Sequence, residues 1–85
     1  MRIWKWTLTI SDRQTLHLPK DAKILSVQPQ NDCPQLWALC DEYAENTPRT
    51  FAMYGTGHIV PGEHGTFIGT FQLRDGHLVF HLFEV

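Results

Sequence analysis

The dipeptide Asp75-Gly76 constrains the fold most, because it lies between two runs of apolar, β-branched and aromatic residues, Thr66–Arg74 and His77–Val85. A two-residue type I′ turn needs positive φ at both central positions, which Asp tolerates and Gly prefers. The pattern therefore predicts a C-terminal β-hairpin in which Leu73 faces Leu78 and the register is fixed by the turn.

This register divides the predicted hairpin into two faces. One face is expected to be core and carries Phe67, Phe71, Leu73, Leu78, Phe80 and Leu82. The other face is half polar and contains the cross-strand pairs Gln72–Val79, Thr70–His81 and Ile68–Phe83. We expect this second face to meet solvent, a partner or a ligand.

Five further segments upstream have the alternation and composition of strands. They are Arg2–Ile10, Thr15–Leu18, Lys23–Gln28, Gln35–Asp41 and Arg49–Tyr54. The second is expected to pair back on the first, and the fourth, which is apolar on both faces, is expected to be central. Seven strands at a spacing of about 8–12 residues, without a useful helix, predict one all-β domain over residues 1–85, a small antiparallel sandwich or barrel.

The same alternation assigns inward-facing side chains in these segments. They are Trp4, Trp6, Leu8, Ile10, Leu25, Val27, Phe51 and Met53. An open sandwich of this size would have exposed edge strands, which need protection or pair with another copy. The sequence therefore favours a homo-oligomer.

Charge and cysteine content restrict the class of protein. The net charge is −2 without a run of like charges, which argues against the basic face of a nucleic-acid-binding protein. No segment approaches the roughly 18 apolar residues of a membrane span, and the N-terminus lacks signal-peptide features. Cys33 and Cys40 would lie about 20 Å apart on an extended strand, too far for a disulfide. Two reduced cysteines fit a cytoplasmic location.

Tyr54-Gly55-Thr56-Gly57-His58 is the strongest candidate for a binding site. Its glycines allow a ligand to approach the backbone, and amide N–H groups near them can converge on an anion. Thr56 and His58 add side-chain donors. No helix is predicted to follow, so the segment is neither a dinucleotide fingerprint nor a P-loop. The alternative is that the glycines only turn the chain. The predicted binding set therefore consists of Tyr54–His58 together with Thr70 and His81 on the open hairpin face.

The five histidines do not predict a metal site by their spacing. His77 and His81 would lie about 13 Å apart on one strand, and only His58, His64 and Glu63 could gather in the loop. No nucleophile–base pair or close carboxylate pair can be assigned. The sequence therefore predicts a non-enzyme without catalytic residues or a cofactor, and a metal-dependent hydrolase is the lesser alternative.

Several segments together resemble a family of short proteins of tailed bacteriophages and prophages described as a domain of unknown function. They are Ile3–Trp6, Lys23–Gln28, Leu36–Leu39, Tyr54–His58, Ile68–Gln72 and Val79–Glu84. The resemblance covers nearly the whole chain. Pro29 stands where the family pattern has a β-former, so we do not expect the third strand to extend past Gln28.

The resemblance implies a setting and not a mechanism. It implies a small accessory protein in the cytoplasm of an infected host, which binds a host or phage protein and can inhibit a host defence system. A second hypothesis is an oligomer that sequesters a nucleotide-like ligand with backbone amides near Gly55 and Gly57 and with the side chains of Thr56, His58 and Arg49.

Overall fold

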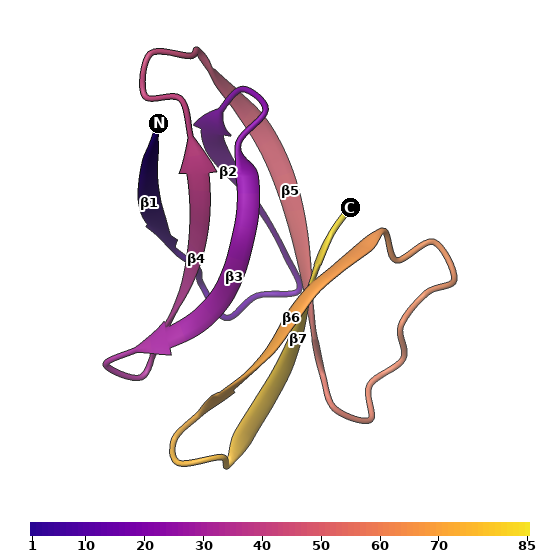
Figure 1. Cartoon of the computed structure of the whole chain (residues 1–85). Coiled ribbons are helices and arrows are strands. Elements are labelled where there is room, and N and C mark those ends of the chain that lie inside the picture. The colour runs from indigo at the N-terminus through magenta and orange to yellow at the C-terminus, as the bar shows by residue number, and fades with distance from the viewer.

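The computed structural model describes residues 1–85 and contains seven strands and no helix. The strands are β1 (Arg2–Thr7), β2 (Arg13–Pro19), β3 (Lys23–Gln30), β4 (Cys33–Cys40), β5 (Asn46–Gly55), β6 (Thr66–Leu73) and β7 (Leu78–Glu84). They form two antiparallel sheets, in the orders β1-β4-β3 and β2-β5-β7-β6 (Figure 1). The all-β prediction is confirmed, and the two sheets do not close into a barrel. No helix is available to cross a membrane.

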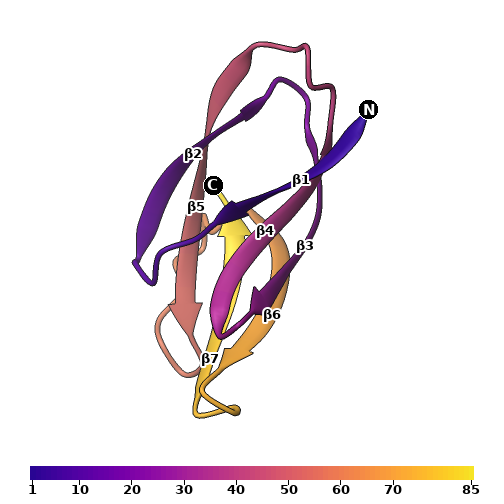
Figure 2. The same ribbon diagram turned by 90° about the vertical axis from the view of Figure 1, so that its left-hand side faces the viewer.

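The core lies between the two sheets, which Figure 2 shows as a front and a back layer. β4 is central in its sheet, as its apolar faces predict. Phe51 and Met53 of β5 are buried, also as predicted. The buried cluster draws on both layers and on the connections: Leu8, Leu18, Ala22, Val27, Leu36, Ala38, Cys40, Phe51, Met53, Phe71, Leu73 and Leu82.

The pairing of β6 with β7 follows the predicted register from Leu73↔Leu78 to Gly69↔Leu82. The predicted two-residue Asp-Gly turn is not shown, because the ladder stops before a four-residue connection, Arg74–His77. Three consecutive residues, Arg74, Asp75 and Gly76, have left-handed φ angles of 52°, 54° and 87°. The Arg74 N–H donates to the Asp32 carboxylate at 2.7 Å, so the β3–β4 turn supports this connection.

A β-bulge at Ile68 changes the outer half of the hairpin. The pairing shifts between Phe67 and Gly69, so Phe83 lies opposite Phe67 and not opposite Ile68. One extra residue moves every side chain before it to the other face of the sheet. The predicted core position of Phe67 is therefore wrong: its side chain is 54% exposed, whereas Ile68 packs against the core.

β2 pairs with β5 in the four-stranded sheet, whereas β1 belongs to the three-stranded sheet. The prediction that β2 pairs back on the first strand is therefore wrong. β1 ends at Thr7, and the segment from Leu8 to Asp12 carries the chain between the layers. Gln14 holds this crossing, because its side chain exchanges hydrogen bonds with the backbone N–H and C=O of Thr9 at 3.0 and 2.8 Å. Leu8 is buried as predicted, but Ile10 is exposed.

β3 also departs from its predicted form in two places. It extends to Gln30, with Pro29 opposite Pro34. The Leu8 N–H donates to the Pro34 carbonyl, so the backbone groups of Pro34 point toward β1 and away from β3. Pro29, which lies opposite Pro34, therefore points away from β4. Its missing N–H falls on the free edge of β3, where proline is tolerated. A bulge at Leu25 exposes that side chain, whereas Val27 is buried as predicted.

Candidate binding site at the root of the Gly55–Gly65 loop

The Gly55–Gly65 loop leaves the end of β5 and returns to β6 at the side of the molecule (Figure 1). Its first turn is held by two backbone bonds: Thr56 N–H donates to the Val79 carbonyl at 3.3 Å, and His58 N–H donates to the Gly55 carbonyl at 3.0 Å. The other end is fixed at Gly65, where an added Cβ would lie only 2.1 Å from the Glu84 carbonyl oxygen. Both ends of the loop are therefore anchored to the four-stranded sheet.

His81 joins the loop to the hairpin. Its Nε2 lies 2.8 Å from the Thr56 hydroxyl, and its Nδ1 lies 2.8 Å from the Thr70 hydroxyl. A neutral imidazole has one donor and one acceptor nitrogen, and each hydroxyl can take the complementary role. Both ring nitrogens are thus occupied, and any metal ion or substrate proton at His81 would first have to displace a threonine hydroxyl.

The structure therefore brings together three members of the predicted binding set, Thr56, Thr70 and His81. Tyr54 lies in the same cross-strand row, because it pairs with His81 in the β5–β7 register. The predicted opposition of Thr70 and His81 is confirmed. This outer face of the four-stranded sheet is half polar, as the hairpin pattern predicts.

An aromatic cluster next to this row was missed by the sequence analysis. Phe83 is its centre, and its ring lies 5.7 Å from Tyr54, 5.0 Å from His64 and 5.4 Å from Phe67, measured between ring centroids. Phe67 belongs to the cluster only because of the bulge at Ile68. The signal that could have indicated the bulge is Gly69, since an isolated glycine inside a strand pattern is typical of one.

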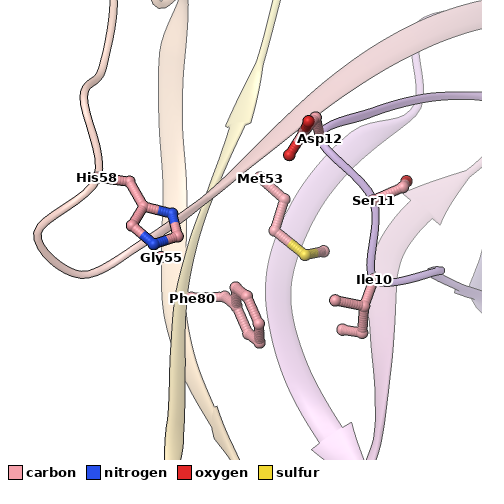
Figure 3. A pocket seen from close by; sticks show the side chains of 7 residues that line it. All are labelled: Ile10, Ser11, Asp12, Met53, Gly55, His58 and Phe80. Carbon is pink, nitrogen blue, oxygen red and sulfur yellow. The ribbon is translucent and has the colours of Figure 1, made fainter.

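His58 lies on the other side of the β5 end. Its ring packs against Gly55, where an added Cβ would lie 2.9 Å from His58 Cε1. The ring lines a cavity of about 100 Å³ together with Met53 and Phe80, opposite Ser11 and Asp12 of the β1–β2 connection (Figure 3). His58 is therefore separated from the Thr70–His81 pair, which occupies the outer face of the sheet.

A second hollow of about 320 Å³ opens beside the first and has His58 and His77 among its lining residues. Thr56 also lines it, together with Gly55, Leu78, Val79 and Phe80. Gly57 has a φ of 88° and open space around its α-carbon, as the glycine argument predicts. The Gly57 N–H has no acceptor within the protein. His77 was not in the predicted set, because it lines this hollow as part of the four-residue Arg74–His77 connection, which the sequence analysis did not predict.

Arg49 does not join these residues. Its Nε and Nη2 donate to the two Glu84 carboxylate oxygens at 2.6 and 2.7 Å, and its Nη1 donates to the Ala22 carbonyl. The hydrogen bonds that Arg49 donates to Glu84 raise the pKa of Arg49 above its ordinary value. The expected use of Arg49 as an anion ligand beside Gly55 and Gly57 is therefore wrong, since the guanidinium is already paired elsewhere.

The titratable side chains do not gather into a metal site. No group of three or more His, Cys, Asp or Glu side chains has the arrangement that a metal ion needs. The His64 ring packs against Phe83 at a tilt of 56°, and its Nδ1 lies 2.9 Å from the Gly65 carbonyl, so it lies against the outer face of the sheet. The arrangement of His58, His64 and Glu63 thus gives the hydrolase alternative no support.

The two cysteines lie at opposite ends of β4, and both are free thiols. The absence of an internal disulfide is as predicted. Burial raises the pKa of the Cys40 thiol, with the Glu42 carboxylate acting in the same direction. Cys40 is therefore a packing residue without the thiolate character of a nucleophile.

The family comparison covers all of these elements. No curated protein and no solved structure matches the chain. The whole chain, residues 1–85, matches the family described as a domain of unknown function, DUF7352. The chain therefore belongs to the DUF7352 family.

Proposed function

We propose that the chain is a non-enzymatic binding protein whose Gly55–Gly65 loop occupies a surface on a protein partner. The observation that carries this proposal is the exposure of Ile59, whose side chain is 91% exposed at the tip of a loop with both ends anchored. Val60 beside it is also exposed. Loops held on a rigid scaffold are common recognition elements, and an aliphatic pair gains free energy when a partner covers it.

The root of the loop supports this role. The Thr56–His81–Thr70 bonds and the packing of His64 on Phe83 restrict how the loop can move. A loop that is ordered before binding loses less conformational entropy when the complex forms. The outer face with Phe67 and Tyr54 lies beside the loop root and would extend the contact area.

The setting is also part of the proposal. The resemblance to short phage and prophage proteins favours an accessory protein of phage origin. Its partner would then be a host or phage protein, and binding would inhibit that partner if it belongs to a host defence system.

Affinity capture from bacterial lysates, with the tag at the C-terminus, tests the proposal. The bait would be compared with Ile59→Asp and Val60→Asp variants, and with Tyr43→Asp as a matched control. Tyr43 is as exposed as Ile59 but lies in the β4–β5 turn. A stoichiometric protein that is lost only with the loop variants supports the proposal. A partner insensitive to both loop variants, or none from several hosts, contradicts it.

A second candidate function is the sequestration of a small anionic, nucleotide-like ligand. The hollow lined by His58 and His77 favours it, because the two imidazole rings provide nitrogen donors and Phe80 provides an aromatic surface. The Gly57 N–H, next to His58 in the chain, has no backbone acceptor. Excess absorbance at 260 nm in the purified protein, lost with His77→Ala but kept with Ile59→Asp, would favour this function over the first. His17→Ala is the control, since His17 is exposed on β2.

A further inference from the structure

β1 is the one edge strand of the two sheets without a device that blocks further pairing. The four edge strands are β1, β2, β3 and β6. β3 has a bulge and Pro29, β6 has a bulge, and β2 ends on Pro19. Bulges and prolines are the means by which proteins protect sheet edges. β1 is a regular ladder from Arg2 to Thr7 and contains neither.

The free side of β1 presents unpaired backbone groups. Leu8 N–H donates to the Pro34 carbonyl across the β1–β4 ladder. Backbone groups alternate in direction along an antiparallel strand, so the even-numbered residues of β1 bond to β4. The N–H and C=O groups of Ile3, Lys5 and Thr7 therefore point away from the sheet. Figure 1 places β1 at the outer side, with β4 between it and β3.

The charges on β1 do not guard this edge. Charged side chains, lysine above all, often protect an edge strand. The Lys5 ammonium instead turns back over its own sheet, where it donates to Gln30 and lies 5.7 Å from the centroid of the Trp37 ring. Arg2 is held by Glu42, with 2.6 Å between Nε and Oε2.

β1 has an exposed large apolar side chain on each of its two faces. Ile3 is 60% exposed on the outer face, and Trp4 is 40% exposed on the face that carries Trp6. Trp4 shares that face with buried Ala38, its partner in β4, so it extends the apolar surface beyond the core. An edge strand with free backbone groups and exposed apolar side chains is a site for strand addition.

We propose that a second copy of this chain pairs with β1, in antiparallel orientation about a two-fold axis beside Trp4. The two three-stranded sheets would then form one continuous six-stranded sheet. A two-fold axis perpendicular to the sheet places one residue of β1 opposite the same residue of the second copy. Each choice of this central residue gives a different register, and the candidates are Ile3, Trp4 and Lys5.

The side chains select the register centred on Trp4. A Lys5-centred register would put two like-charged side chains opposite each other, which is destabilising, although each ammonium leans over its own sheet. An Ile3-centred register would leave part of the strand without a partner. With Trp4 at the centre, Ile3 of each copy pairs with Lys5 of the other, and both residues have outward backbone groups. Arg2 then lies opposite Trp6 of the second copy, with its guanidinium still held by Glu42, and the two Trp4 rings are neighbours.

Sedimentation analysis of the C-terminally tagged chain over a range of concentrations tests the dimer. We expect the mass to rise to that of two chains, and Lys5→Pro to weaken association by on the order of tenfold or more, because one outward N–H is lost from each copy. Lys5→Gln removes the same ammonium but keeps the N–H, so it is the matched control. A monomer at every concentration would overturn the proposal, as would equal association of the Lys5→Pro and Lys5→Gln variants.

Cysteine crosslinking tests the register independently of the proline variant. Trp4 would form a non-hydrogen-bonded pair with its copy, with Cα atoms about 4.5 Å apart, within the range that a disulfide bridges. In a Cys33→Ser background, with Cys40 left buried, Trp4→Cys should oxidise to a covalent dimer, whereas Ile3→Cys and Lys5→Cys should not. A covalent dimer from Ile3→Cys in place of Trp4→Cys would overturn the assigned register.

Discussion

Gly69 of β6 lies against Val27 of β3, so closely that a Cβ added to Gly69 would be 2.9 Å from Val27 Cγ1. The two residues belong to different sheets, and Val27 is part of the buried cluster. The absent side chain at position 69 therefore lets the edge strands β3 and β6 approach each other. The regular register of the hairpin, which pairs Gly69 with buried Leu82, places this glycine on the inner face of the sheet.

Gly69→Ala should lower the free energy of unfolding by about 1–3 kcal/mol, because an extra methyl group in a packed layer displaces its neighbours. Val27→Ala removes the obstructing methyl groups. The cost of Gly69→Ala should therefore be smaller in the Val27→Ala background, a coupling that a double-mutant cycle of urea unfolding would measure. Gly62→Ala is the control, since Gly62 has open space around it. Equal costs in both backgrounds would contradict the contact.

Glu84 and Arg49 connect the C-terminal strand to β5 and to the start of β3. Two charge-assisted bonds to Glu84 and one bond to the Ala22 carbonyl leave the guanidinium well satisfied. Glu84→Gln should cost about 1–2 kcal/mol in the free energy of unfolding, since one carboxylate oxygen becomes an amide that faces a donor. Glu45→Gln should be neutral, because the exposed Glu45 side chain has no ion pair. Equal unfolding midpoints for the two variants would show that the pair adds nothing.

Alternation was sufficient to locate all seven strands and most inward-facing residues. It could not assign β2 to the opposite sheet, because a short strand after a turn has the same pattern whether it pairs with the preceding strand or crosses to another layer. It also could not show the bulges at Leu25 and Ile68. One inserted residue reverses the faces of a strand without changing its composition, so Leu25 and Phe67 were placed in the core and are exposed.

The candidate site was predictable only where it depends on local sequence patterns. Thr70 and His81 followed from the hairpin register, and Thr56 followed from the glycine loop. The return of the loop onto Phe83 was not predictable, because it depends on the position of His64 and on the bulge that turns Phe67 outward. Arg49 was misassigned because its partner, Glu84, is 35 residues away in the sequence.

Glu42 should make the stability of the fold depend on pH. A hydrogen bond from its own backbone N–H, followed by bonds from Arg2 and the N-terminal ammonium, holds the pKa of this carboxyl below its ordinary value of 4.5. A group with a lowered pKa in the folded state stabilises the fold above its unfolded pKa, and this contribution is lost as the pH falls through the folded pKa. Glu42→Gln should therefore lower Tm at pH 7, and the difference from the original chain should shrink below about pH 4. Calorimetric scans at both pH values would measure this, with Glu63→Gln, an exposed loop position, as the control. A Tm difference of the same size at both pH values would mean that the Glu42 charge is not the source of the stabilisation.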